Sequence, residues 1–381
     1  GYNAAQNMTA GYNTIIGNEA GFAMTTGDYN VLMGVSAGAN ITGSQQNVII
    51  GAYAGRMLQA SKRLVAIGYE AAYMAPTGYQ VAIGHAALRN PTTATENMAV
   101  GYEALVGAGS STANYNTALG NFTLSSVTNA ERNVAVGHHA LKQVTTGDDN
   151  VAVGIYAGDA ITEAGDNVLV GKEAGTTLTT GPQNVFIGSE AGESAVGAGY
   201  NVAIGSDAYK TAVTGNYNIA IGKNAMNNGL VTASFALGMG YEALKNLTSA
   251  GATIAIGAYA GRDHTTGSDN VFIGHNAGSG STSAGNNVAI GKDTLMAVQD
   301  STNGGLNTAV GQGAAVDTTG MRNTMLGYKT GYTSTSANSN VFIGYEAGYK
   351  NTTGDSNVFI GNKAGPSSTS TDSNKLYIHN N

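Results

Sequence analysis

The sequence predicts an all-β fold, a parallel β-solenoid (β-roll) of about 21 coils of about 17 residues that assembles into a trimeric fibre. A pattern of Asn, three apolar residues and Gly, as in Asn357 to Gly361, recurs along the whole chain of 381 residues. There are 21 closing glycines, and the 344 residues from Gly17 to Gly361 form 20 intervals with a mean of 17.2 residues. A regular period of this kind is the signature of a solenoid. Continuous repetition indicates one shaft domain, residues 1–381.

The three apolar residues of each pattern predict a short strand, as in Val341 to Ile343. β-Branched residues dominate these positions, and they fit a pleated strand better than a helix. Ala stands three residues after the closing glycine in 17 of the 21 copies, which predicts a tight corner. The rest of each repeat is rich in Thr, Ser, Gly and Asn and predicts turns that return the chain to the next strand.

A single coil of this size cannot be stable alone. Ordering its backbone costs about 1 to 2 kcal/mol per residue, whereas three buried apolar side chains contribute about 1.5 to 3 kcal/mol each. The coils must therefore stack, with parallel strands about 4.8 Å apart.

An asparagine opens the strand in 17 of the 21 copies. Stacked asparagines can hydrogen-bond amide to amide along the axis, and Asn also suits the turn before a strand. We expect a structural Asn ladder, most regular in one run of six coils: Asn133, Asn150, Asn167, Asn184, Asn201 and Asn218.

The middle strand position is also apolar, although it points to the opposite face from its two neighbours. We interpret it as an outward stripe that needs a second cover, and the same stripe on identical chains around an axis would supply it. A dimer, or a loop of the same chain folded over the stripe, are the alternatives. The predicted interface of a parallel homotrimer consists of Ala66, Ala82, Ala135, Ala152, Phe186, Ala203, Ala220, Phe272, Phe342 and Phe359.

Composition excludes several classes of function. Only 11% of residues are charged, the net charge is -7 and there is no basic run, so a nucleic-acid partner is not expected. The chain has no Cys, which excludes disulfides and thiolate metal sites. No apolar run approaches about 20 residues, so no membrane insertion is expected.

The repeats resemble those of two families of fibrous protein. The strings Asn201 to Ala208 and Asn218 to Ala225 are similar to the head repeat of trimeric autotransporter adhesins, which form a β-roll in a trimer. The strings Asn97 to Leu105 and Asn133 to Leu141 resemble the repeat arrays of phage tail fibres more closely. The ending Ser373 to Ile378 resembles the junction that precedes a tip or an endosialidase-type chaperone in such fibres.

Two columns of polar residues are candidate binding sites. Acidic residues fall two positions after the glycine in successive coils, at Glu173, Glu190 and Asp207, where they either are screened by water and Lys172 or hold a divalent cation. These carboxylates are also the only regular candidates for hydrolase chemistry, which needs a carboxylate pair. Tyrosines precede the strand asparagine at Tyr12, Tyr29, Tyr79, Tyr115, Tyr200 and Tyr217, where exposed rings could stack on sugars or simply line a wet edge.

Three intervals are longer than the others. The intervals that end at Gly120, Gly257 and Gly311 contain 19, 19 and 20 residues. The extra residues, near 107–113, 239–241 and 299–305, predict loops that project from one face, as insertions in repeats often do.

Together these observations favour a structural protein without enzymatic activity or cofactor. The resemblance implies the shaft of a phage tail fibre, located on the virion outside the cell, which presents a receptor-binding tip for host attachment. Its expected partners are its own copies, a host surface glycan or a downstream tip domain. The alternatives are a bacterial cell-surface trimeric adhesin and a self-assembling extracellular filament, while ice binding is disfavoured because Thr pairs do not occur in every coil.

Overall fold

The predicted β-solenoid is confirmed by a computed structural model of the chain. The structure describes residues 1–9, 11–74, 78–90, 94–107, 112–297, 305–365 and 369–379, and these contain no helix and 22 short strands. The chain comprises two compact units, the N-terminal unit Gly1–Ser189 and the C-terminal unit Glu190–Asn381. Both units carry the same repeat.

The strands follow one another at intervals of about 17 residues. Those of the N-terminal unit are β1 (Thr14–Ile16), β2 (Val31–Met33), β3 (Val48–Ile50), β4 (Leu64–Ile67), β5 (Gln80–Ile83), β6 (Met98–Val100), β7 (Thr117–Leu119), β8 (Val134–Val136), β9 (Val151–Val153), β10 (Val168–Val170) and β11 (Val185–Ile187). Those of the C-terminal unit are β12 (Val202–Ile204), β13 (Ile219–Ile221), β14 (Leu237–Met239), β15 (Ile254–Ile256), β16 (Val271–Ile273), β17 (Val288–Ile290), β18 (Thr308–Val310), β19 (Thr324–Leu326), β20 (Val341–Ile343), β21 (Val358–Ile360) and β22 (Leu376–Ile378).

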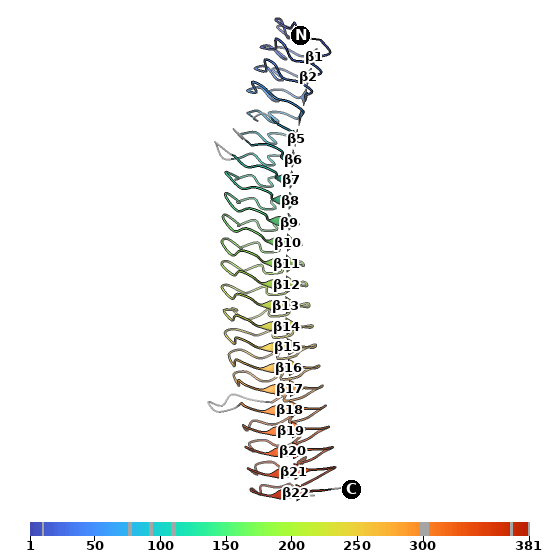
Figure 1. The fold of residues 1–381 in the computed structure, drawn as a ribbon, viewed down its shortest axis with the longest axis vertical. Coiled ribbons are helices and arrows are strands. Elements are labelled where there is room, and N and C mark those ends of the chain that lie inside the picture. Colours follow the sequence, from blue (N-terminus) through green and yellow to red (C-terminus); the bar gives the residue numbers. More distant parts are fainter. Residues whose placement is uncertain are drawn as a thin grey trace. The chain divides into compact units, whose positions relative to one another are not determined.

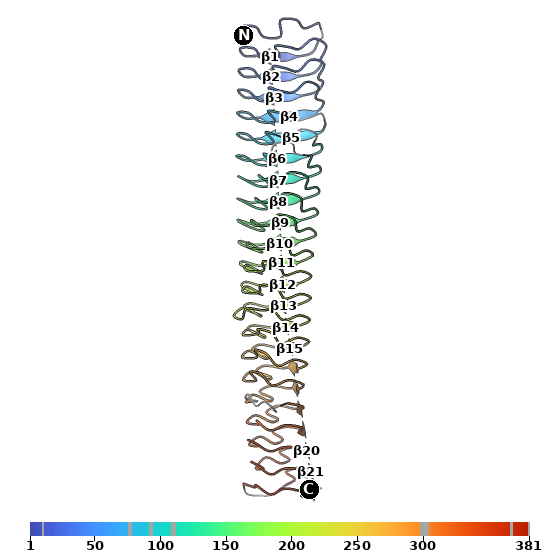
Figure 2. The ribbon, with the colours of Figure 1, turned by 90° about the vertical axis from the view of Figure 1, so that its left-hand side faces the viewer.

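Within each unit every strand pairs in parallel with the strand of the next coil. Figure 1 shows this stacking for β12 to β22, and Figure 2 shows it for β1 to β11. Equivalent residues lie side by side, so that Val134 pairs with Val151 and Val151 with Val168. The return segments are paired as well, since the Thr145 amide donates to the Thr162 carbonyl at 2.9 Å. Backbone hydrogen bonds therefore run from coil to coil around the repeat, as a solenoid requires.

The closing glycines turn the chain sharply at the end of each strand. Gly34 has a φ of 136° and Gly51 a φ of 135°, which is the left-handed side of backbone space that glycine adopts most readily. A Cβ on Gly34 would lie 2.5 Å from the carbonyl oxygen of Gly51 in the next coil. The corner glycines thus stack directly on one another, and this close approach explains why the slot is constant.

The interior of a coil is shared by the middle strand residue and the residue six positions later. In β20 the middle residue is Phe342, and the later position is Gly348, where a Cβ would lie 2.5 Å from the Phe342 ring. In β8 the middle residue is the small Ala135, and the later position holds Leu141, which is fully buried. In these two coils a large residue at one position accompanies a small residue at the other, so the two positions share one enclosed space.

One corner was assigned incorrectly from the sequence. Gly238, from which the 19-residue interval to Gly257 was counted, is not a closing glycine but the middle residue of β14, where it pairs with Ala220 and Ala255. The corner of this coil is Gly240, with a φ of 136°. The strand slot filled elsewhere by Asn is therefore taken by Ala236, whose backbone amide donates to the Asn218 side chain at 2.9 Å. The residues 239–241 belong to the strand and corner and are not an insertion.

The other two predicted loops lie largely outside the described residues. Residues 108–111 of the first and 299–304 of the third are not described. These loops stay predictions.

Candidate functional site

The residues predicted to form a trimer interface point into the interior of their own chain. The residues assigned to it are fully or almost fully buried within one chain: Ala66, Ala82, Ala135, Ala152, Phe186, Ala203, Ala220, Phe272, Phe342 and Phe359. They fill the solenoid interior, so they cannot contact a second chain. The prediction that each strand has two distinct faces is correct, but the middle residue points inward rather than outward. Ala203→Glu would therefore bury a carboxylate inside the coil.

The outward residues are the first and third of each apolar triplet, which we call the strand face. In every strand from β2 to β21 these two residues are half-buried or exposed, while the one between them is buried. Ile256 in β15 is 37% exposed and Ile290 in β17 is 36% exposed. Each unit therefore presents a face of Val, Ile, Leu and Met that its own described residues leave open to solvent.

The strand face carries no charge. Its 22 strands supply 44 outward positions, of which 40 are Val, Ile, Leu or Met and four are Thr. An exposed apolar surface of this kind within each unit favours a contact with another molecule. The sequence contains the signal for the strand face, because the first and third positions of the triplet are apolar in nearly every copy. These two positions were assigned to the core instead.

The predicted Asn ladder is present in both units. In the N-terminal unit the Asn150 carboxamide oxygen accepts from the backbone amide and the side-chain amide of Asn167, at 3.1 and 3.0 Å. The Asn150 side-chain amide donates to the Asn133 oxygen and to the Ala164 carbonyl, at 3.1 and 2.8 Å. Asn133, Asn150, Asn167, Asn184 and Asn218 are fully buried and Asn201 is 1% exposed. These side chains stabilise the stack from inside and are not a binding surface.

The acidic column is neutralised by lysines in the structure. Lys172 pairs with Glu173 at 3.2 Å in the N-terminal unit. In the C-terminal unit the Lys210 ammonium donates to Glu190 and, at 3.0 Å, to Asp207. These hydrogen bonds raise the pKa of Lys210. Burial alone would raise the pKa of the Asp207 carboxyl, but the hydrogen bond from Lys210 opposes burial, and the pKa of Asp207 is lowered. The ammonium therefore occupies the place between Glu190 and Asp207 that a cation would take.

Among the residues that the structure describes, no three His, Cys, Asp or Glu side chains gather as metal ligands would. The same parts of the chain contain no helix of sufficient length and apolarity to cross a bilayer.

Two buried titratable side chains replace apolar residues in the interior. The Tyr209 hydroxyl donates to the Gly215 carbonyl at 2.9 Å and accepts from the Asn218 amide at 2.8 Å, and burial raises the pKa of this phenol. His264 is fully buried, its Nδ1 lies 3.0 Å from the Ser281 carbonyl, and burial lowers the pKa of the imidazole. Both side chains are enclosed by neighbouring coils, which excludes substrate from them.

The tyrosine column is exposed, and four of its six rings stack in two pairs. Tyr12 and Tyr29 stack with centroids 5.1 Å apart, and Tyr200 and Tyr217 stack at 4.9 Å. A ring face that covers its neighbour is not open to a sugar. The exposures of the six predicted residues run from 44% to 80%: Tyr12, Tyr29, Tyr79, Tyr115, Tyr200 and Tyr217. Tyr79 differs from the others because a guanidinium, that of Arg63, lies over its ring.

Fold and surface together define the class of the protein: it is a parallel β-solenoid repeat protein with an uncovered apolar strand face. No known protein-family model matches the chain, and a search among curated proteins found no match.

Proposed function

We propose that the chain is a non-enzymatic structural protein, the shaft of a fibre of the kind that phage tail fibres use to present a receptor-binding tip to a host. The observation that supports this proposal is the strand face, which is apolar, uncharged and repeated in every described coil. A surface of this composition is costly to leave in water, at about 25 cal/mol per Å² of apolar area. In this proposal the strand face is covered by assembly, and the fibre acts outside the cell on the virion.

In this proposal, two further copies of the same chain cover the strand face. A partner must present apolar residues at the spacing of the coils, and an identical chain in parallel orientation offers that spacing automatically. A charged partner would lose hydration without gaining an ion pair, because the strand face has no charged residue. We therefore propose a parallel homotrimer that meets through the strand face rather than through the buried Ala and Phe column.

The oligomeric state tests this proposal directly. We expect light scattering to give three times the chain mass of 38.4 kDa, and electron microscopy to show rods. The double variant Ile256→Lys and Ile290→Lys places two ammonium groups on the strand face and is expected to yield the single-chain mass with unchanged circular dichroism.

Leu230→Lys is the matched control, because Leu230 is 70% exposed but lies outside the strands. It should leave the trimer intact. A wild-type chain that scatters as a monomer would refute self-association, and a strand-face variant that stays trimeric would refute the assigned interface.

A further inference from the structure

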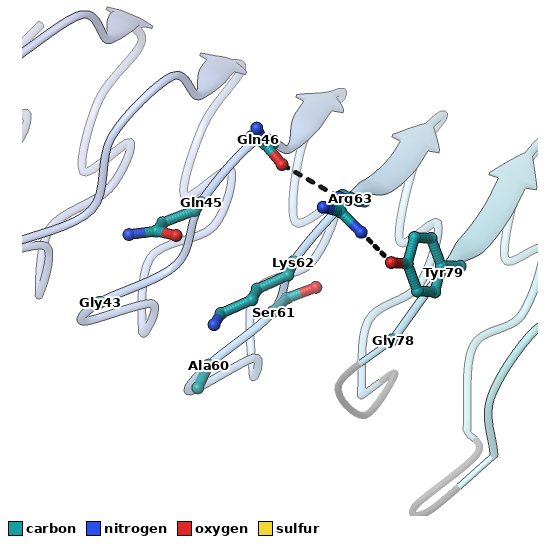
Figure 3. A pocket seen from close by; sticks show the side chains of 9 residues that line it. All are labelled: Gly43, Gln45, Gln46, Ala60, Ser61, Lys62, Arg63, Gly78 and Tyr79. Carbon is teal, nitrogen blue, oxygen red and sulfur yellow. Dashed lines mark hydrogen bonds between the residues drawn. The ribbon is translucent and has the colours of Figure 1, made fainter.

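A hollow opens in the N-terminal unit beside Tyr79, and it has a volume of about 560 Å³. Its polar lining comes from three neighbouring coils: Gln45, Gln46, Ser61, Lys62, Arg63 and Tyr79. Figure 3 shows Arg63 between Gln46 and Tyr79, with Lys62 and Gln45 projecting from the adjacent return segments. The volume falls within the range of pockets that bind small molecules.

The hollow exists because the repeat is irregular at this point. The interval from Gly68 to Gly84 contains 16 residues instead of 17. Leu64 pairs with Gln80, so the residue that takes the place of Lys62 one coil later is Gly78. A glycine leaves empty the space that the side chains of Gln45 and Lys62 occupy in the two preceding coils.

The two cations at the hollow, Lys62 and Arg63, form no ion pair with any carboxylate in the described part of the chain. Most ion pairs in the chain tie a cation to a nearby carboxylate, as between Arg132 and Asp149 at 2.7 Å. Within the described residues no carboxylate pairs with Lys62 or Arg63, and both side chains are exposed. Two adjacent uncompensated cations make this a site of positive potential on a chain of net charge -7.

Arg63 is held in place before any ligand arrives. Its Nε donates to the Gln46 oxygen at 3.1 Å, a terminal nitrogen donates to the Tyr79 hydroxyl, and the guanidinium carbon lies 4.9 Å from the Tyr79 ring centroid. Fixing the planar fork in advance lowers the entropy that a bound anion must offset. The remaining donors of the fork match the two oxygens of a carboxylate.

We propose that this hollow binds an acidic sugar unit, with its carboxylate on Arg63 and Lys62 and its hydroxyl groups on the amides of Gln45 and Gln46. Neutral amides and a phenol suit a ring that carries several hydroxyl groups beside one charge. An acidic peptide is disfavoured because the backbone here is already paired: the Gln45 amide donates to the Ser61 carbonyl and the Arg63 amide to the Gln45 carbonyl, both at 3.1 Å. No free strand edge remains in these coils for a peptide to join.

Titration with matched small molecules tests the proposal. Glucuronate and glucose differ only in a carboxylate against a hydroxymethyl group, and inorganic phosphate and triglutamate represent a bare anion and an acidic peptide. We expect saturation-transfer NMR to detect glucuronate on the wild-type chain, with glucose and triglutamate about tenfold weaker or more, and inorganic phosphate to displace glucuronate only at about tenfold higher concentration or more. We expect Arg63→Gln to weaken glucuronate about tenfold or more, as loss of a charged hydrogen bond implies, and Lys62→Gln to weaken it by a smaller factor.

Arg322→Gln is the control, because Arg322 occupies the slot of Arg63 in a coil of the C-terminal unit, directly before the strand asparagine. It should bind glucuronate as the wild type does. Equal binding of glucose, phosphate or triglutamate, or an Arg63→Gln variant that binds glucuronate normally, would overturn the assignment. The site rests on the proposed function in that it would supply the contact with a host surface glycan that the sequence leads us to expect. Light scattering on the same variants separates sugar binding from assembly, since Arg63→Gln is expected to remain trimeric.

Discussion

Phe342 and Gly348 show how side-chain volume is divided inside one coil. The Phe342 ring fills the space in which a side chain at position 348 would lie, and Leu141 fills the corresponding space above Ala135. The described coils never pair two large residues at these positions. The exchange is a local constraint, because the partners are only six residues apart in sequence.

This constraint predicts a compensating double variant. Phe342→Ala should destabilise the chain by about 3 to 5 kcal/mol, because it leaves a cavity and removes the stacking of Phe342 on Phe359 at 4.8 Å. Gly348→Leu alone should be more harmful still, since the new side chain meets the Phe342 ring. The double variant recreates the arrangement of Ala135 with Leu141 and should recover part of the loss. Denaturant titration of all four chains gives the coupling, and strictly additive losses would contradict the shared-volume explanation.

At the residue scale the sequence predicted which positions matter but not which way they point. A strand with two apolar faces can have either face inward, because alternation separates the faces without showing which one is buried. The volume exchange between Phe342 and Gly348 could have settled it, since only residues that share an enclosed space need to compensate one another. The outward strand face would then have been assigned to Val341 and Ile343 from the sequence alone.

At the scale of the element, the asparagine side chain before each strand completes the hydrogen bonding at the start of that strand. The Asn150 oxygen accepts two hydrogen bonds from Asn167, one of them from the backbone. It thereby supplies a partner where the strand ladder has not yet begun. Where Leu64 replaces the asparagine, the strand itself is one residue longer and Leu64 pairs directly with Gln80.

Asn150→Leu tests the contribution of the ladder. Leucine leaves the Asn167 amide and the Ala164 carbonyl buried without their partners, and each unsatisfied group costs about 1 to 3 kcal/mol. We expect the free energy of unfolding to fall by about 2 to 5 kcal/mol, measured by denaturant titration. Asn129→Leu is the control on an exposed return segment and should change it by less than about 1 kcal/mol. Equal effects of the two substitutions would show that the ladder is dispensable.

The elements themselves were predictable because their signals repeat. The asparagine slot, the strand triplet and the corner glycine recur about every 17 residues, so an error in one copy is corrected by the others. Gly238 escaped this correction because it stands two residues before the true corner, Gly240, in a coil whose asparagine is replaced by Ala236.

At the scale of the whole molecule, each strand contacts only the strands of the adjacent coils within its unit. The free energy of unfolding is then approximately the sum of the stabilities of the individual coils and of the interfaces between neighbouring coils. The prediction of a single continuous domain is consistent with this arrangement but stays a prediction.

Deleting one complete coil should therefore be tolerated. Removing residues 134–150 joins Asn133 to Val151 and brings Leu124 into the position that Leu141 occupies beside Gly158. We expect cooperative thermal unfolding with the melting temperature lowered by a few degrees, followed by circular dichroism. Removing residues 138–145 leaves a partial coil that cannot pair in register with its neighbours, and it should lower the melting temperature further and split the transition in two. Equal damage from both deletions would argue against independent coils.

The repeat could be predicted from the sequence, whereas the hollow beside Tyr79 could not. It depends on one missing residue between Gly68 and Gly84 and on the glycine at position 78, and neither stands out in a chain with 56 glycines. The interval from Gly311 to Gly327 also contains 16 residues, but Met321 stands there in the place of Gly78, so the combination has no second copy to confirm it.

The coil-to-coil hydrogen bonding has a kinetic consequence. A turn of backbone is complete only when the following turn lies against it, so the first pair of turns is the most difficult to form and each later one adds to an existing template. The same template accepts a matching turn from a neighbouring molecule as readily as from its own chain. Refolding at low protein concentration therefore favours correct stacking within one chain, whereas a high concentration of newly made chains favours pairing between coils of different chains.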